Sequence, residues 1–135
     1  MDLFFGKGSR PEAPALIGTS GDVVTWDALC HQISDIATLL GPERRLVAIE
    51  AHQTIDTLIA YLGALSAGHA VAMLPPSDAR AWTAFERDFS PDAAYRGPGE
   101  GWDIYDLPAG EDRPPLHPDL ALLLSTSGST GESKF

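Results

Sequence analysis

The stretch LVAIEAHQTIDTLIAYLGALSAGHAVAML, residues 46–74, decides the fold of this chain. Its two ends, residues 46–49 and 70–74, are short continuous apolar runs, as expected of strands that are covered on both faces. Between them we predict a helix that Gly68 closes, with apolar side chains along one side: Ile55, Leu58, Ile59, Leu62 and Leu65. A strand, a helix and a second strand in this order predict a crossover unit with parallel strands.

Upstream of this unit the sequence predicts a hairpin and a helix. Residues 15–17 and 23–25 are short β-type segments on either side of a Gly-rich turn, which favours a β-hairpin. The helix that follows is predicted to be capped by Thr25 and ended by Gly41. Its predicted buried face contains the side chains at spacings of three and four: Trp26, Leu29, Cys30, Ile33, Ala37 and Leu40.

Downstream the alternation of helices and strands continues. Ser77 is expected to cap a third helix whose aromatic side chains, Trp82, Phe85 and Phe89, repeat at helical spacing. Short strands are predicted at residues 93–95, 104–107 and 120–124, and residues 97–118 form a Pro/Gly-rich acidic connector. We therefore predict an α/β fold: a mostly parallel sheet flanked by helices, with a short N-terminal β-hairpin.

Composition limits the partners of this domain. The 135 residues are enough for one domain, and the net charge is −10, from 19 acidic and 9 basic residues. This charge argues against nucleic acid and against an anionic membrane surface as partners. Cys30 is the single cysteine, no apolar run is long enough to span a membrane, and the first residues lack the order of a signal peptide. We therefore expect a cytoplasmic protein.

The segment Ser125-Thr126-Ser127-Gly128-Ser129-Thr130-Gly131-Glu132-Ser133-Lys134 follows the strand predicted at residues 120–124. A loop at the carboxyl end of a central parallel strand occupies the usual ligand position of α/β folds. Its glycines allow close approach to the main chain, consecutive amides can hold anionic oxygens, and hydroxyls and a lysine add donors. These features favour a polyphosphate ligand. A flexible Ser/Gly linker is the structural alternative.

Two other phosphate loops are excluded by spacing. A Walker loop requires a glycine directly before the lysine, but Ser133 stands there. A dinucleotide fingerprint requires glycines that neither the segment at residues 125–134 nor the run at residues 97–101 supplies, because Thr130 and Trp102 occupy the required positions.

The sequence T-S-G-S-T-G-E-S-K at residues 126–134 resembles the phosphate-loop signature T-S-G-[ST]-T-G-x-P-K of the adenylate-forming enzymes. These include acyl-CoA synthetases, adenylation domains of nonribosomal peptide synthetases, and luciferase. The chain departs from the pattern at Ser133, where proline is usual. Residues 24–29 resemble the family's early L-T-Y-x-E-L segment, and residues 65–78 resemble L-K-A-G-x-x-x-x-P-L-D, in the family's order.

The resemblance implies that residues 1–135 are the N-terminal portion of an AMP-binding (adenylation) domain, with its phosphate loop at 126–134. It implies an ATP-dependent ligase that activates a carboxylic acid as an acyl-adenylate and passes it to a thiol, either coenzyme A or the phosphopantetheine arm of a carrier protein. ATP would bring Mg²⁺. By resemblance, the nucleotide-binding residues are Thr126, Ser127, Gly128, Ser129, Thr130, Gly131 and Lys134.

The resemblance also implies that the family's later segments, among them a C-terminal lid domain with a catalytic lysine, lie beyond these residues. We therefore expect no catalytic residue within the 135 residues, and a fragment that is inactive alone and prone to self-association. The alternative is a non-catalytic nucleotide-binding or interaction domain with a Ser/Gly-rich tail. The sequence does not identify the carboxylic acid.

Other chemically reactive side chains have simpler interpretations. No pair of histidines has metal-ligand spacing, so we predict no metal site and structural roles for His31, His52, His69 and His117. Cys30 is expected to be a small core residue rather than a nucleophile. The acids at residues 100–112 are expected to be solvated parts of the connector.

Overall fold

The computed structural model describes residues 10–105, 115–127 and 133–134. Its elements follow in the order β1 (Pro14–Ile17), β2 (Val23–Thr25), α1 (Trp26–Leu40), β3 (Leu46–Glu50), α2 (Ile55–Ser66), β4 (Ala70–Leu74), α3 (Ala79–Phe89), β5 (Ala93–Tyr95), β6 (Trp102–Ile104), β7 (Leu122–Leu124), β8 (Thr126–Ser127) and β9 (Ser133–Lys134). Within these residues no helix is both long enough and apolar enough to cross a membrane.

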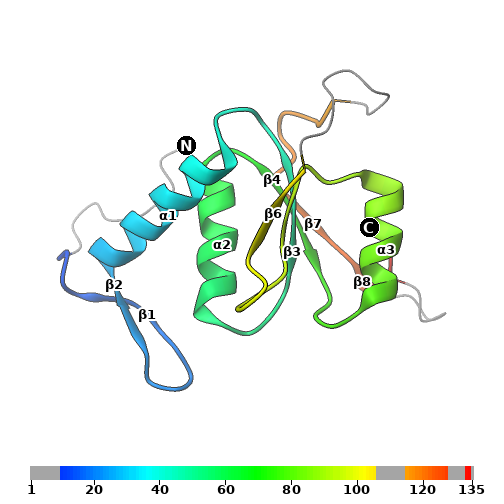
Figure 1. The fold of residues 1–135 in the computed structure, drawn as a ribbon. Coiled ribbons are helices and arrows are strands. Elements are labelled where there is room, and N and C mark those ends of the chain that lie inside the picture. Colours follow the sequence, from blue (N-terminus) through cyan, green and yellow to red (C-terminus); the bar gives the residue numbers. More distant parts are fainter. Residues whose placement is uncertain (1–9, 106–114, 128–132, 135) are drawn as a thin grey trace.

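A five-stranded sheet in the order β6-β5-β3-β4-β7 forms the centre of the molecule (Figure 1). Strand β3 runs parallel to both β4 and β5, and β4 runs parallel to β7. Only β6 is antiparallel to its neighbour, β5. Strands β1 and β2 pair separately as an antiparallel hairpin. The predicted fold class, a mostly parallel sheet with an N-terminal hairpin, is confirmed.

The helices cover the two faces of the sheet in layers. Helix α2 lies on one face and α3 on the other, while α1 packs on the outer side of α2 next to the hairpin (Figure 1). Two core clusters correspond to these faces: one joins α2 to the sheet through Ala60 and Ala64, and the other joins α3 through Trp82 and Phe85. Because both faces are covered, β3 and β4 are buried almost throughout, as their continuous apolar runs predict.

Helix α1 begins and ends where the sequence predicts. The Thr25 hydroxyl accepts a hydrogen bond from the Ala28 N–H at 3.2 Å, and Gly41 closes the helix with φ +77°. Its buried side chains are Leu29, Ile33 and Leu40, whereas Cys30 is exposed. The prediction that Cys30 is a core residue was therefore wrong.

The predicted apolar face of helix α2 is confirmed only in part: Ile59 is buried, and Ile55, Leu62 and Leu65 pack against the core, but the buried side also includes small residues that the prediction omitted. Its most buried residues are mostly small ones, including Ala60, Gly63 and Ala64, whereas Leu58 is 40% exposed. This helix lies between α1 and the sheet, so small residues are needed where its neighbours approach closely. At Gly63 an added Cβ would lie 2.8 Å from the Cβ of Ile36 on α1, which explains the glycine inside a helix.

Several boundaries differ from prediction, and strand β7, for example, begins at Leu122 rather than at residue 120. Asp78, not Ser77, caps α3: its Oδ1 accepts from the Ala81 N–H at 3.0 Å. Strand β6 covers Trp102–Ile104 rather than beginning at Ile104, because these residues pair with β5. The remaining positions of the predicted strand, 106 and 107, lie outside the described residues.

Strand β7 is the last strand on its side of the described sheet, whereas we expected a central position. Its side chains Leu122 and Leu124 are 36% and 59% exposed. An apolar edge of this kind favours association with another strand. The expected self-association stays a prediction.

Candidate functional site

The predicted phosphate loop begins at the carboxyl edge of the parallel sheet. Strand β7 pairs with β4 so that Leu124 lies opposite Met73, and the chain then enters β8. The side chain of Arg44 ties the segment before β7 to the body of the protein. Its guanidinium donates to the carbonyl oxygens of Gly68 and His117 at 2.5 and 3.0 Å, and also to that of Leu120. The loop therefore starts where α/β folds bind ligands.

The two ends of this loop are paired through their backbones. In the antiparallel pair of β8 and β9, Thr126 lies opposite Lys134 and Ser127 lies opposite Ser133. This backbone pairing brings the two ends of the segment together, as in a loop. A flexible linker would need no such pairing. The binding roles of Thr126, Ser127 and Lys134 remain predictions, as do those of the residues that lie outside the described part: Gly128, Ser129, Thr130 and Gly131.

A second polar group occupies the same edge of the sheet, after β3 and β4. The Glu50 carboxylate at the end of β3 accepts a hydrogen bond from the Ser77 N–H at 2.6 Å, and the same Oε1 lies 3.2 Å from Nε2 of His52. The Glu50 side chain is only 12% exposed. Ser77 has φ +58°, a left-handed conformation that is costly for a residue other than glycine. The carboxylate thus joins the loops that follow two adjacent strands.

The loop after β5 completes this group at Gly97. A Cβ added at Gly97 would lie 2.6 Å from Cδ2 and 2.8 Å from Nε2 of His52. Gly97 also has φ +104°. Glycine therefore satisfies both the backbone conformation and the close approach of the imidazole. We name Glu50, His52, Ser77 and Gly97 the carboxyl-edge cluster.

Sequence analysis did not find the carboxyl-edge cluster. Glu50 and His52 directly follow a buried apolar run, which is a usable signal, but Ser77 and Gly97 are brought to them only by strand pairing. The cluster holds three loops together. It contains no group of three or more potential metal ligands, and none occurs elsewhere among the residues that the structure describes.

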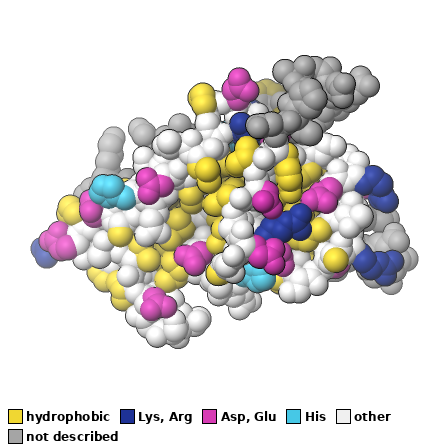
Figure 2. Space-filling view, in the orientation of Figure 1, with side chains coloured by type: hydrophobic (Ala, Val, Ile, Leu, Met, Phe, Trp, Pro, Cys, Tyr) yellow, Lys and Arg dark blue, Asp and Glu magenta, His cyan; other side chains and the backbone are white. Residues whose placement is uncertain are grey.

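The chain has an excess of acidic side chains, with a net charge of −10. On the face shown in Figure 2, Asp and Glu side chains are scattered over the surface, and the Lys and Arg side chains form no continuous stripe on that face. A candidate anion site in this protein must therefore rely on local donors rather than on a general positive field.

Comparisons with known proteins identify the architecture. No protein-family model and no curated protein matches the chain. Among solved structures, ATP-bound MatB from Rhodopseudomonas palustris matches 92% of this chain and 31% of its own, with 22% identity and a TM-score of 0.67. The N-terminal subdomain of Klebsiella oxytoca NpsA, in complex with 3-hydroxybenzoyl-AMSN, matches 91% of this chain and 36% of its own, with 23% identity and a TM-score of 0.61.

A third match is MenE from E. coli with bound OSB-AMS, which has 23% identity and a TM-score of 0.51, over 85% of this chain and 24% of its own. The chain thus spans between 24% and 36% of the length of these three structures. At these identities the likeness concerns the fold. It confirms the resemblance to adenylate-forming enzymes at that level. The described residues have the architecture of part of the adenylate-forming fold.

Proposed function

We propose that this chain is the N-terminal part of the adenylation domain of an ATP-dependent ligase, which activates a carboxylic acid as an acyl-adenylate. One observation carries the proposal: the T-S-G-S-T-G-E-S-K segment follows β7 at the carboxyl edge of a sheet with this fold. Two matched structures contain ligands, ATP in MatB and 3-hydroxybenzoyl-AMSN in NpsA, and these ligands support nucleotide binding by the complete protein.

In this proposal the loop contributes position and charge. The substrate carboxylate attacks the α-phosphorus of ATP, the bond from that phosphorus to the β-phosphate bridging oxygen breaks, and pyrophosphate leaves. Lys134 and the loop hydroxyls and amides at residues 126–131 hold the β- and γ-phosphates and compensate the charge of the leaving group. Such catalysis requires no nucleophile from the loop. Mg²⁺ accompanies ATP.

The later steps of the proposed reaction concern the complete protein. The acyl group passes from the adenylate to a thiol, either coenzyme A or a carrier protein's phosphopantetheine arm. Since the chain spans so little of the matched structures, we propose that the 135 residues alone do not complete adenylation. The single cysteine fits a reducing, cytoplasmic location.

Nucleotide binding by the complete protein tests the role of the loop. Lys134→Ala is expected to weaken ATP binding roughly 10- to 100-fold, the range for losing a hydrogen bond to a charged group. AMP binding, which lacks the β- and γ-phosphates, is expected to change much less. Arg87→Ala is the matched control, because Arg87 is an exposed cation on α3 paired with Asp88. Unchanged ATP affinity in Lys134→Ala would instead favour an interaction domain with a Ser/Gly-rich tail.

A further inference from the structure

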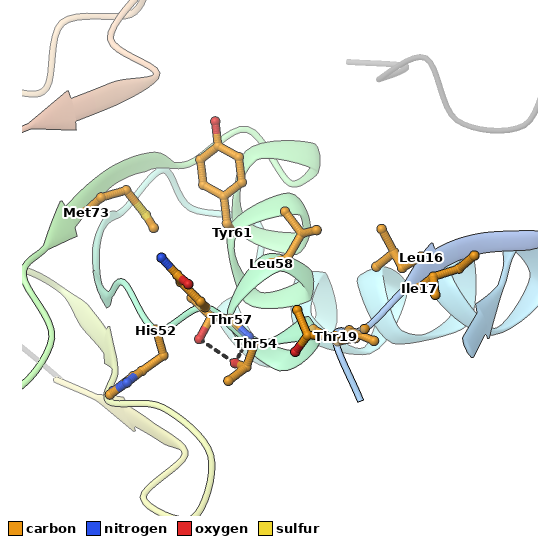
Figure 3. Close-up of a pocket in the computed structure, with 12 residues that line it drawn as sticks. Leu16, Ile17, Thr19, His52, Thr54, Thr57, Leu58, Tyr61 and Met73 are labelled. Atoms are coloured by element: carbon orange, nitrogen blue, oxygen red, sulfur yellow. Dashed lines mark hydrogen bonds between the residues drawn. The ribbon is translucent and has the colours of Figure 1, made fainter. Parts of the chain in front are cut away.

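Strand β7 connects the body of the protein to β8, and its own side chains hold it weakly. Leu122 and Leu124 are exposed, and Leu123 is only partly buried against the core cluster on the α3 face. On the α2 face, Met73 pairs with Leu124 and lines an open cavity of about 360 Å³ (Figure 3). No residue of β7 belongs to the lining of this cavity, so β7 gains no dense packing from it.

The sequence of β7 leaves its register on β4 open. A slip by one residue turns every side chain of a strand to the opposite face, and burial of one face normally prevents it. In β7 all three residues are leucines, so a slip in either direction places Leu122 or Leu124 where Leu123 now packs. Each residue of slip would displace β8 by about 3.3 Å along the strand. The apolar pattern of β7 therefore does not fix the position of β8.

Arg44 provides a fixed reference at the opposite, amino edge of the sheet. Arg44, Gly68 and Leu120 each lie two residues before a strand, β3, β4 and β7 respectively. The Arg44 guanidinium donates to the Gly68 and Leu120 carbonyls together, and these charge-assisted bonds align the start of β7 with the start of β4. Its third bond, to the His117 carbonyl at 3.0 Å, holds the turn before β7. A slip of β7 would move the Leu120 carbonyl away from the guanidinium.

The two segments that Arg44 joins are themselves held in place. The turn before β7 is closed by a hydrogen bond from the Leu120 N–H to the His117 carbonyl at 3.0 Å. On the other side, the N–H of Arg45 donates to Nδ1 of the buried His69 at 3.1 Å, next to the start of β4. Because both segments are already ordered, the bonds of Arg44 restrict their relative position at little further cost in backbone entropy.

We propose that Arg44 is a positioning residue for nucleotide binding: it fixes the register of β7 on β4 and thereby places Thr126 and Ser127 of β8 for the phosphates of ATP. Arg44 acts through β7 and touches no nucleotide, because it lies at the amino edge and β8 follows the carboxyl edge. This inference rests on the proposed function. Molecules in another register would not bind, so the apparent dissociation constant rises as the competent fraction falls.

Nucleotide binding by the complete protein tests this role. Arg44→Ala is expected to weaken ATP binding roughly tenfold, the lower end of the range for hydrogen bonds to a charged group, because Arg44 is exposed. AMP lacks the β- and γ-phosphates, so AMP binding is expected to stay unchanged. Arg87→Ala removes the same charge from an exposed position on α3 and is expected to leave both affinities unchanged.

Arg44→Lys separates the hydrogen-bond geometry from the charge. Lysine keeps the positive charge but lacks the planar fork that reaches several carbonyls at once. We expect it to weaken ATP binding roughly 2- to 5-fold, about the loss of one modest hydrogen bond, again without a change for AMP. This variant decides the question if Arg44→Ala does not fold.

Hydrogen exchange of the complete protein gives a readout without nucleotide. In Arg44→Ala, peptides covering residues 115–124 are expected to exchange roughly tenfold faster than in the wild type, because the local opening of β7 becomes easier. Arg44→Lys is expected to accelerate the same peptides less. Peptides from α2 are expected to exchange at the wild-type rate. A role of Arg44 in global stability alone would accelerate both regions.

The role of Arg44 is overturned if ATP affinity is unchanged in Arg44→Lys or in a folded Arg44→Ala, or if AMP binding weakens as much as ATP binding. Wild-type exchange at residues 115–124 in the variants, or equal acceleration in α2, would also overturn it. Lys134→Ala distinguishes this failure from that of the proposed function. If Lys134→Ala weakens ATP binding and the Arg44 variants do not, only the role of Arg44 is refuted. Unchanged ATP binding in Lys134→Ala refutes the proposed function, and the nucleotide role of Arg44 with it.

Discussion

Gly97→Ala tests whether the carboxyl-edge cluster is held by close contact. The new Cβ would lie 2.6 Å from Cδ2 of His52, and the backbone would keep φ +104°. The left-handed conformation costs about 1–2 kcal/mol for alanine. Forcing a methyl group against the partly exposed His52 imidazole adds about 1–3 kcal/mol. We therefore expect Gly97→Ala to lower the free energy of unfolding by about 2–5 kcal/mol.

Gly99→Ala and His52→Ala separate these two contributions. Gly99 has φ +96°, and a Cβ there would meet no atom within 4 Å, so its substitution carries the conformational cost alone. In a His52→Ala background the contact is absent, and the cost of Gly97→Ala is expected to fall to about 1–2 kcal/mol. The assay is equilibrium urea unfolding of the four variants and the wild type. Equal costs for Gly97→Ala and Gly99→Ala, or a Gly97→Ala cost that His52→Ala leaves unchanged, would refute the reasoning.

Three further predictions concern packing, pH and reactivity. Gly63→Ala is expected to lower the free energy of unfolding by up to about 2 kcal/mol in urea, because the clash with Ile36 outweighs the higher helix propensity of alanine. In an Ile36→Ala background the same substitution is expected to stabilise the protein. Stabilisation by Gly63→Ala in the wild-type background would contradict this. Burial, then the charges of Arg45 and Arg44, lower the pKa of His69 below its ordinary 6.5, against the opposing effects of Gly41 and Asp92, so that the folded protein binds the proton less readily than the unfolded chain. The contribution of His69 to the free energy of unfolding is therefore expected to be fully present above pH 6.5 and to be lost as the pH drops below it. The free energy of unfolding is expected to fall less steeply with decreasing pH in His69→Gln than in His31→Gln, a control at an exposed histidine. Equal slopes in the two variants would contradict this. Cys30 is expected to react with a thiol reagent in the native protein, and reaction only after unfolding would contradict its exposed position.

The strand and helix order could be predicted because each signal is local. Residues 46–49 and 70–74 are continuous apolar runs, and they became β3 and β4. Thr25 and Gly41 mark the ends of α1 by side-chain and backbone chemistry that operates within one turn. The phosphate-loop segment could likewise be placed after β7, because a strand precedes it directly in the sequence.

The features that the sequence did not predict depend on contacts between helices and strands that are distant in the sequence. Helical spacing does not distinguish Leu29 from Cys30, and only packing against α2 and the hairpin shows that the buried side includes Leu29. In α2, the predicted apolar face included Leu58, which is exposed, and omitted the small residues Ala60, Gly63 and Ala64, which are buried. The carboxyl-edge cluster requires β3, β4 and β5 to be adjacent, which no short segment encodes.

The central proposal, adenylation of a carboxylic acid, is tested most directly by identifying the products of ATP. The complete protein would be incubated with ATP, Mg²⁺ and a panel of carboxylic acids, with exchange of labelled pyrophosphate into ATP as the readout. We predict carboxylate-dependent exchange, with AMP and pyrophosphate as products, and its loss in Lys134→Ala but not in Arg87→Ala. Formation of ADP and phosphate, or the absence of carboxylate-dependent exchange across the panel, would contradict the proposal.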